Sequence, residues 1–490
     1  MDRLLGLLVR ILVWLAGYSK RLARIGIGQY DEWHPGRKLK ILLVGYNGAR
    51  NTGADARVAA IARQLKDIFN PDQIEITVMA LDTDNLKGYF DPDVKLYKFT
   101  TLFPWPLYRA CCASHMAVLS EGSALKSTFA DALTLFFCQA SGIMRRQHKP
   151  CIAYGTEAGQ MDDFLKKISA DLCRGTYFIA RTREAMDVLR SLNLKGHAGT
   201  DTAWCYDGAI SDEAARVWLM EAGWDGKKPC IGAAVINPFC WPVKASLARW
   251  IRGRITGHME DCYDKWYFFS RSPQRTQAFE RYIDGIASAI NRYSREHDAF
   301  VTIIGMEKLD KEACHKLAAR LDEPSAILLS ADQSADIMTG VLRQMSMLVT
   351  SRYHAAVLSM EKAIPVIAVS MDERLDSLLG ECGLDEDYLL HAADEDLEDG
   401  IYQRLVMAAD RRDLIHEAIR RQTDHYRKEL DQMGIFLRKF TRHMLEKQYG
   451  KNAAQALQKQ YGKGAAQPSL QKQYGKESQE ILKKDYGKGA

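Results

Sequence analysis

The sequence predicts an α/β protein with two Rossmann-like doubly wound domains facing a cleft, an N-terminal helix and a low-complexity C-terminal tail. Three observations support this prediction. The chain has 490 residues, more than one ordinary domain needs. Short apolar runs alternate with helical segments along most of its length. The alternation weakens between about 205 and 228 and then restarts, which indicates two successive sheets.

In the first half, the expected strands are 38–45, 73–80, 116–120, 151–155 and 177–181. Helical segments separate them at 55–68, 130–146 and 183–193. In the second half, the expected strands are 230–236, 300–306, 326–330, 347–351 and 365–370, with helices near 273–297, 310–322, 333–345 and 354–362. Two such halves are typical of a GT-B-like arrangement, whose ligands bind beyond the carboxyl ends of the strands. The expected domains are 37–210 on the acceptor side and 228–395 on the donor side, followed by helices over 396–445.

The N-terminal segment 1–36 contains an apolar run at 4–17 that only Arg10 interrupts. At this length it is short for a bilayer span, which needs about 20 residues. Lys20, Arg21 and Arg24 follow it. This pattern favours an amphipathic helix at the inner face of a cell membrane, in a cytoplasmic peripheral protein. The alternative is a helix packed on the protein's own surface.

The tail at 446–490 repeats the unit QYGK, once as DYGK. Each unit has about one leucine, which is too little for a core, so we expect disorder and a possible role in binding a protein partner. Residues 1–40 have a net charge of 8 − 3 = +5, and residues 441–490 have 10 − 4 = +6. These basic ends favour an anionic membrane surface as partner, and we expect no nucleic acid.

The chain has eleven cysteines and no C-x-x-C motif, so neither a zinc ribbon nor a redox pair is indicated. We expect reduced thiols, mostly in the core. We also expect no metal site and no cofactor.

The first candidate loop follows the first strand and reads GYNGARNTGAD over 45–55. Glycines such as Gly45 and Gly53 let backbone amides approach an anion, and the next helix N-terminus favours negative charge. Asn51 and Asp55 are expected to cap that helix or contact a ligand. The pattern is neither G-x-G-x-x-G nor a Walker A motif, so NAD and ATP are not implied. The alternative is a tight turn without a ligand.

Two further loops follow later strands. One contains Glu121, Gly122 and Ser123, and the other contains Glu157 between two glycines. Both are expected at the rim of the same cleft.

The sharpest candidate is the segment VTSRYHAA at 349–356, where a strand ends and a helix begins. Ser351 precedes Arg352, whose planar fork suits a phosphate or carboxylate. His354 can exchange a proton near neutral pH. In the alternative interpretation, both residues have structural roles. Arg352 pairs with a local carboxylate, and His354 caps the helix or packs against neighbouring side chains.

The order of these segments resembles the polysaccharide pyruvyl transferase family over roughly 39–390. The similar segments are ILLVGYNGARNTGADA, MAVLSEGSAL, KPCIAYGTEAG, FIARTREAMDVLRSLNL, GTDTAW and LVTSRYHAAVLSMEKAIPVIAVSMDERLDSLLGECGL. The fourth of them contains Arg181 and the fifth contains Asp201, and the resemblance implies that both belong to the acceptor or cleft loops. Ser120-Glu121 stands where the family has two glycines, and Ala54 where it often has Asp.

The resemblance implies a transferase that moves pyruvate from phosphoenolpyruvate, as co-substrate, onto a sugar hydroxyl and forms a ketal. The acceptor would be a cell-envelope exopolysaccharide or its sugar or lipid-linked precursor. Arg352 and Arg374 would hold the donor, His354 would protonate it, and Asp55 or Glu121 would activate the hydroxyl. Two alternatives remain: a GT-B glycosyltransferase that uses a nucleotide sugar, and a non-catalytic membrane-attached member.

Overall fold

The structure is a computed structural model, which describes residues 2–26, 28–100, 102–256, 262–264, 267–457 and 478–485. The chain divides into two compact units. The first comprises 1–48, 57–202 and 428–490, and the second comprises 49–56 and 203–427. The second unit therefore includes the loop that follows the first strand. The long last helix begins in the second unit, and its final part belongs to the first.

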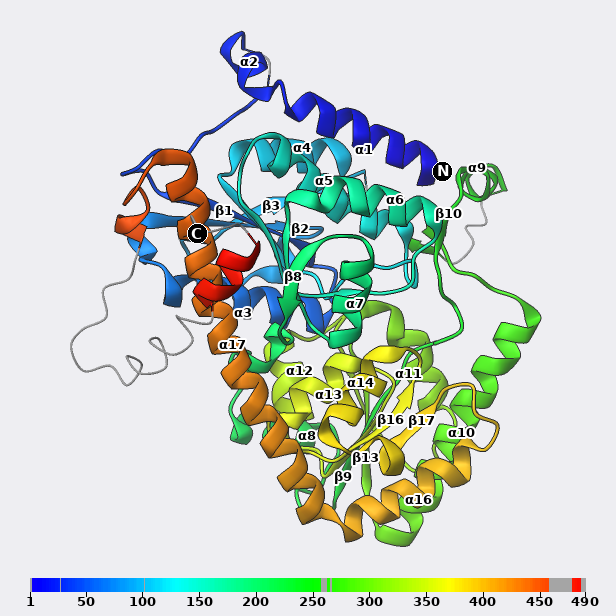
Figure 1. The fold of residues 1–490 in the computed structure, drawn as a ribbon. Helices are drawn as coiled ribbons and strands as arrows, with labels where there is room; N and C mark the ends of the chain where they lie inside the picture. Colours follow the sequence, from blue (N-terminus) through cyan, green and yellow to red (C-terminus); the bar gives the residue numbers. More distant parts are fainter. Residues whose placement is uncertain are drawn as a thin grey trace, which may run out of the picture. The chain divides into compact units, whose positions relative to one another are not determined.

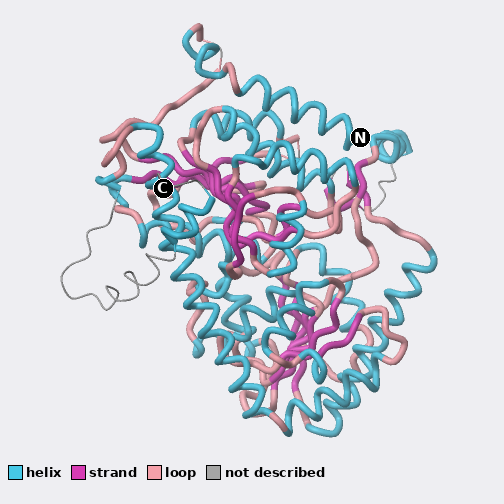
Figure 2. The backbone as a smooth tube through the Cα atoms, in the orientation of Figure 1, coloured by secondary structure: helices cyan, strands magenta, loops and turns pink. Residues whose placement is uncertain are grey.

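Figure 2 shows the strands in magenta. The first unit is built on a parallel sheet with the order β3-β2-β1-β4-β6-β7-β8, and β5 pairs with β6. Successive strands are added on one side of β1 up to β3 and on its other side from β4 onward. The strand order therefore reverses between β1 and β4, and ligands of such sheets bind at this reversal point. The strands are β1 (Leu39–Asn47), β2 (Ile74–Ala80), β3 (Lys95–Lys98), β4 (Met116–Leu119), β5 (Ser123–Leu125), β6 (Cys151–Ala158), β7 (Tyr177–Ala180) and β8 (Lys195–Ala198).

The second unit contains a parallel sheet with the order β14-β13-β9-β15-β16-β17. In sequence order this is the 3-2-1-4-5-6 arrangement of the Rossmann fold, with its reversal between β9 and β15. The strands are β9 (Cys230–Ala234), β13 (Phe300–Gly305), β14 (Ala326–Leu329), β15 (Met347–Thr350), β16 (Val366–Ser370) and β17 (Leu389–His391). A small antiparallel sheet adds β10 (Lys244–Ala245), β11 (Cys262–Asp264) and β12 (Tyr267–Phe268).

Helices flank both parallel sheets (Figure 1). The first unit contains α1 (Asp2–Ala16), α2 (Ser19–Arg24), most of α3 (Thr52–Ile68), α4 (Pro104–Ala113), α5 (Asp131–Arg146), α6 (Asp163–Leu172) and α7 (Arg183–Ser191). The second contains α8 (Asp212–Glu221), α9 (Leu247–Thr256), α10 (Pro273–His297), α11 (Lys311–Ala318), α12 (Ala335–Leu342), α13 (Tyr353–Met360), α14 (Glu373–Cys382), α15 (Asp385–Tyr388), α16 (Leu397–Asp410) and the start of α17 (Arg412–Tyr449).

The doubly wound α/β fold class is confirmed, because each of the ten expected strands overlaps a strand of one of the two parallel sheets. The structure adds short strands that the sequence did not indicate. Two of them, KLYK in β3 and KGHA in β8, lie at sheet edges, are four residues long and are partly exposed. They lack the apolar runs on which the prediction depended. The expected linker also contains α8, which Ser211 caps and which buries Ala215 and Leu219.

The described parts of the tail differ from the expected disorder. Leu457 is buried, and its carbonyl accepts a hydrogen bond from the backbone amide of Asn70 at 3.0 Å. Residues 478–485 form a helix that buries Leu482. The carboxylate of Asp485 accepts a hydrogen bond from the hydroxyl of Tyr177 at 2.9 Å. A single leucine per repeat is too little for a core of its own, but Leu457 and Leu482 are each buried in the structure. The rest of the tail, 458–477 and 486–490, lies outside the described residues.

The N-terminal ends of β1 and β4 enclose a buried histidine. The Nδ1 atom of His115 accepts a hydrogen bond from the backbone amide of Lys40 at 3.0 Å, and its Nε2 atom lies 3.4 Å from Asp31. Burial lowers the pKa of His115 from 6.5 to about 4, although Asp31 acts in the opposite direction. The folded state therefore resists protonation of this ring down to about pH 4.

We expect this histidine to make folding sensitive to acid. Between pH 6.5 and 4 the unfolded chain binds a proton that the folded protein does not, so stability is full above pH 6.5 and falls as the pH falls, by up to about 3 kcal/mol. Urea denaturation of His115→Asn, which keeps an acceptor, should show a smaller loss in this window. His148→Asn, at an exposed histidine with positive φ, is the matched control and should retain the full loss. Equal losses in both variants would contradict this origin.

Among the described helices, none combines the length and the apolar character needed to cross a bilayer. α1 packs on α4 and α5 with one face, as the alternative interpretation expected.

Candidate functional site

The loop after β1 turns sharply at Gly48. Its φ is +73°, and a Cβ there would lie 2.3 Å from the carbonyl oxygen of Asp82, so only glycine fits. From residue 49 the loop belongs to the second unit, where Asn51 forms an antiparallel bridge with Glu307. The backbone amide of Thr52 donates to the carbonyl of Met306 at 2.9 Å. The end of β13 therefore holds the start of α3.

His354 packs directly on this loop. A Cβ added to Gly53 would lie 2.1 Å from the Nδ1 atom of His354 and 2.3 Å from its Cγ atom. The glycine is therefore needed for the imidazole to approach the backbone. Gly53 lies in the first turn of α3, and His354 lies in the first turn of α13. The contact joins two helix N-termini at the end of β15, beside the reversal point of the second sheet.

Arg352 is engaged by two carboxylates of its own unit. Its Nε atom donates to Asp310 at 2.9 Å, a second nitrogen also donates to Asp310, and that nitrogen lies 3.3 Å from Glu307. Asp310 is fully buried, and burial raises its pKa although Arg352 lowers it. The alternative interpretation of Arg352, a local ion pair, is the arrangement that the structure contains. Arg352 thereby holds the side chain of Glu307, whose backbone forms the antiparallel bridge with Asn51.

The other expected donor-side residues are also partnered. Arg374 forms a bidentate pair with Asp372, with distances of 2.7 Å from Nε to Oδ1 and 2.6 Å from the terminal nitrogen to Oδ2. The hydroxyl of Ser351 lies 2.8 Å from the hydroxyl of the buried Tyr282. Asp55 is buried in the first turns of α3, with 2% of its surface exposed.

Glu121 lies at the carboxyl end of β4, at the reversal point of the first sheet. One of its carboxylate oxygens accepts from the backbone amide of Tyr46 at 3.2 Å, and the other accepts from that of Gly122 at 2.9 Å. The side chain is only half-buried. Gly45 gives room beside it, because a Cβ there would lie 2.4 Å from the hydroxyl of Ser120. Glu121 is therefore a fixed carboxylate that solvent reaches.

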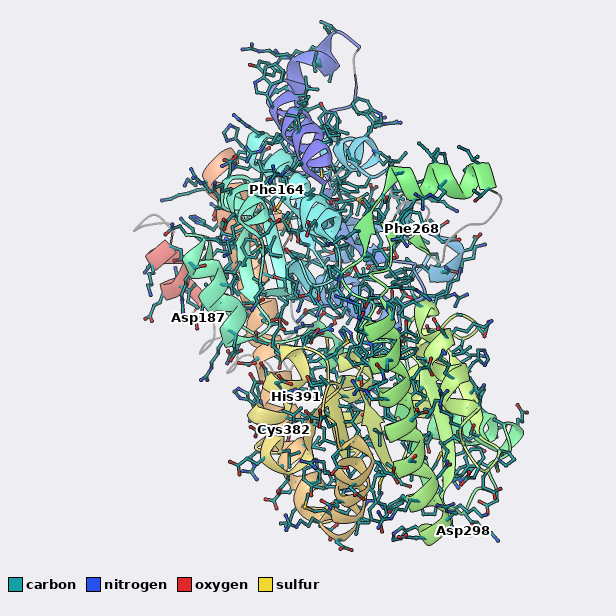
Figure 3. All side chains as sticks on the ribbon, turned by 90° about the vertical axis from the view of Figure 1, so that its right-hand side faces the viewer. Phe164, Asp187, Phe268, Asp298, Cys382 and His391 are labelled. Atoms are coloured by element: carbon teal, nitrogen blue, oxygen red, sulfur yellow. The ribbon has the colours of Figure 1, made fainter. Side chains whose placement is uncertain are left out.

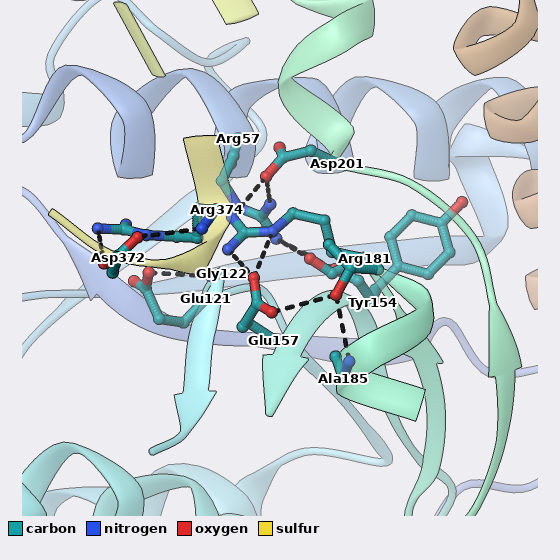
Figure 4. Close-up of polar contacts among 12 residues, drawn as sticks. Arg57, Glu121, Gly122, Tyr154, Glu157, Arg181, Ala185, Asp201, Asp372 and Arg374 are labelled. Carbon is teal, nitrogen blue, oxygen red and sulfur yellow. Dashed lines mark hydrogen bonds and ion pairs between the residues drawn. The ribbon is translucent and has the colours of Figure 1, made fainter. Parts of the chain in front are cut away.

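Three predicted acceptor-side residues come together in a buried ion cluster with Arg57 (Figure 4). Arg181 donates to Glu157 at 3.0 Å and to Asp201 at 3.0 Å, and Arg57 pairs with Asp201. Arg57 also donates to the carbonyl of Gly155 at 2.8 Å. The four charged side chains are at most 2% exposed and their charges cancel. They join the ends of β6 and β7 to the start of α3.

Two further predicted residues lie next to this cluster. Gly122 leaves room for Arg181, since a Cβ at this glycine would lie 2.9 Å from a guanidinium nitrogen of that side chain. Ser123 begins β5 and pairs with Glu157 along the backbone.

Sequence reasoning missed Arg57 and the two acids that pair with Arg352. Arg57 has one usable signal in the sequence, because it is the only basic residue in the otherwise small and apolar stretch around Asp55, at 52–58. Glu307 and Asp310 have no such signal, because they lie more than forty residues before Arg352 and only the tertiary fold brings them there. Among the described residues, no group of three or more His, Cys, Asp or Glu side chains is arranged to hold a metal ion.

Two solved structures illustrate what this chain is similar to. A protein from Anabaena, solved in complex with UDP-glucose, is similar over 84% of this chain and 99% of its own, with a TM-score of 0.50 and 10% identity. A UDP-GlcNAc 2-epimerase from Neisseria meningitidis, bound to UDP-GlcNAc, is similar over 78% of this chain and 94% of its own, with a TM-score of 0.48 and 10% identity. At such identity the first likeness concerns the fold alone, which is GT-B-like.

Comparison with curated proteins gives no match. The sequence model of one family, polysaccharide pyruvyl transferase, matches residues 51–373. The match begins at Asn51, in the loop that packs on His354, and it includes the whole segment around Arg352. Because it spans well over half of the 490 residues, the chain belongs to the polysaccharide pyruvyl transferase family.

Proposed function

We propose that this protein transfers pyruvate from phosphoenolpyruvate onto two hydroxyls of a sugar and forms a ketal. The packing of His354 on Gly53 carries the proposal, together with the family match over the same residues. It puts a proton carrier where the N-termini of α3 and α13 meet. Helix N-termini attract anions, so this place suits a compact anionic donor beside an acid.

A buried hydroxyl supports the same place. Thr52 is 2% exposed, and its Oγ1 atom has no hydrogen-bond partner among the described residues. An unpartnered buried hydroxyl is costly unless a ligand or water completes it. It immediately precedes Gly53, so it is a further candidate to donate to the phosphate or carboxylate of the donor. Because Arg352 and Arg374 are each neutralised by carboxylates, we assign the anion first to the Thr52 hydroxyl and to the positive N-termini of α3 and α13.

The proposed steps balance as follows. His354 donates a proton to C3 of phosphoenolpyruvate, which makes C2 electrophilic. A sugar hydroxyl adds to C2 and loses its proton to a basic group of the protein. The C2–O bond to phosphate then breaks, and a second hydroxyl of the same sugar adds to C2. One of the two hydroxyl protons restores His354, and the other leaves with inorganic phosphate.

Thermal unfolding with a ligand panel tests the identity of the donor. Phosphoenolpyruvate at about 100 times its dissociation constant should add about 2.7 kcal/mol of stability, because it binds only the folded protein. UDP-glucose and UDP-GlcNAc belong in the panel, because solved proteins of similar fold bind them. Stabilisation by a nucleotide sugar and none by phosphoenolpyruvate would overturn the proposal in favour of a glycosyltransferase. No stabilisation by any of them would favour the non-catalytic alternative.

A further inference from the structure

α1 has two apolar faces, of which the protein covers one. Its inner face buries Gly6, Val9, Leu12, Val13 and Ala16. These residues are packed closely: a Cβ on Gly6 would lie 2.5 Å from the ring of Phe164 on α6, and a Cβ on Gly142 of α5 would lie 2.9 Å from Val13. Figure 3 labels Phe164 beside this helix. The inner face therefore fixes which residues of α1 point outward.

The outer face is a stripe of large apolar side chains at helical spacing. Its members are 41–71% exposed and are Leu4, Leu7, Leu8, Ile11, Trp14 and Tyr18. With Ile25, they make up seven of the fourteen large apolar side chains that are exposed in the described part of the chain. A helix that is apolar all round is normally covered on every side. A contiguous exposed patch of this kind marks an interaction surface.

Nearly all charged side chains in the same segment as this stripe are basic. Residues 2–25 contain five basic side chains and a single acidic one, Asp2. Arg3, Arg21 and Arg24 are exposed and make no ion pair with the described residues, whereas Arg10 pairs with Asp171 and Lys20 pairs with Glu32. Arg21 and Arg24 lie on α2, directly after the stripe. The surface is therefore apolar with a basic border.

We propose that the outer face of α1 and the cations of α2 dock on the surface of an anionic phospholipid membrane. Apolar side chains enter the boundary between headgroups and acyl chains, and the arginines contact the acidic headgroups. Trp14 and Tyr18 suit this boundary, because each has an apolar ring and a polar group. The 15 residues of α1 extend about 22 Å, less than the roughly 30 Å of a bilayer core, so the helix lies along the surface. A second copy that docked through the same face would bring the same cations, with Asp2 as the acidic residue of that segment.

Vesicle flotation of the full chain tests the apolar stripe. Vesicles of phosphatidylcholine with 30% phosphatidylglycerol should carry the protein, and vesicles of phosphatidylcholine alone should carry much less. The triple variant Leu7→Ser, Leu8→Ser, Ile11→Ser should bind more than about a hundredfold more weakly. The triple Val217→Ser, Met220→Ser, Leu414→Ser, at apolar residues that are also exposed, is the control and should bind like the wild type. All of these side chains are exposed, so melting temperatures should change little.

A charge variant tests the basic border independently. Arg21→Gln with Arg24→Gln should weaken binding to anionic vesicles about thirtyfold, and added salt should reduce this difference. Arg420→Gln with Arg421→Gln, at exposed positions of α17, should leave binding unchanged. Wild-type protein that ignores anionic vesicles, or a serine triple that binds as the wild type does, would overturn the proposal. So would a wild-type dimer in light scattering that the serine triple converts to monomer, because the occupant would then be a second copy.

Discussion

Replacing His354 with alanine should lower turnover by about 10²–10⁴-fold and leave the affinity for phosphoenolpyruvate almost unchanged. A positioned acid contributes a rate factor of this size, whereas the anion contacts proposed above come from the Thr52 hydroxyl and the two helix N-termini. Phosphate release measures turnover, and ligand-dependent thermal shift measures affinity. The imidazole is only half-buried, so the variant should remain folded.

Gly53→Ala tests whether the position of His354 matters. The new Cβ would lie 2.1 Å from the Nδ1 atom, so the ring must move away and turnover should also fall. Combining Gly53→Ala with His354→Ala should cost little more than His354→Ala alone, because the two changes remove the same function. Gly380→Ala is the control. Gly380 also lies in a helix, α14, and the nearest atom to a Cβ there is 3.9 Å away, in Asp385. Full turnover in His354→Ala would remove this histidine from the mechanism.

Arg352→Met should destabilise the protein by about 3–5 kcal/mol. The substitution removes the cation that pairs with the fully buried Asp310, and an uncompensated buried charge carries a penalty of this size. Urea denaturation measures the loss. Arg295→Met is the matched control in the same unit: its pair with Asp322 is exposed, so it should cost less than about 1 kcal/mol.

A double variant separates the ion pair from donor binding. Adding Asp310→Asn to Arg352→Met removes the buried charge and should restore much of the lost stability. If Arg352 bound the donor directly, as the sequence alone suggested, the single variant would keep its stability and lose affinity for phosphoenolpyruvate. That pattern would contradict the structural assignment of Arg352.

The central strands of both sheets could be predicted because they are buried on both faces and appear as continuous apolar runs, such as KILLVG in β1 and MLVT in β15. The edge strands carry mixed side chains and became visible only through their pairing. The position of Gly53 and His354 at strand ends was also readable from the sequence. Their direct contact was not, because 301 positions separate them (354 − 53) and only the fold brings them together.

The charged residues were the least predictable part of the candidate site. Arg352 and Glu157 were expected at the site from their places after strands, and Arg374, Arg181 and Asp201 from the family resemblance. In the structure each is bound to another charged side chain of its own unit. Sequence spacing indicates that a charge is near a strand end, but the identity of its partner depends on residues far away in the chain. Glu121 differs from this group, because backbone amides fix it and its surface remains partly open.

The product formed from phosphoenolpyruvate in D₂O tests the central claim most directly. With 3-¹³C-phosphoenolpyruvate and a panel of sugars that carry neighbouring hydroxyls, we predict release of inorganic phosphate and a ¹³C-labelled ketal methyl group that contains one deuterium. The single deuterium would come from protonation at C3, and it should disappear with turnover in His354→Ala. Release of UDP from a nucleotide sugar onto the same panel, with phosphoenolpyruvate left intact, would contradict pyruvyl transfer and assign this fold to glycosyl transfer.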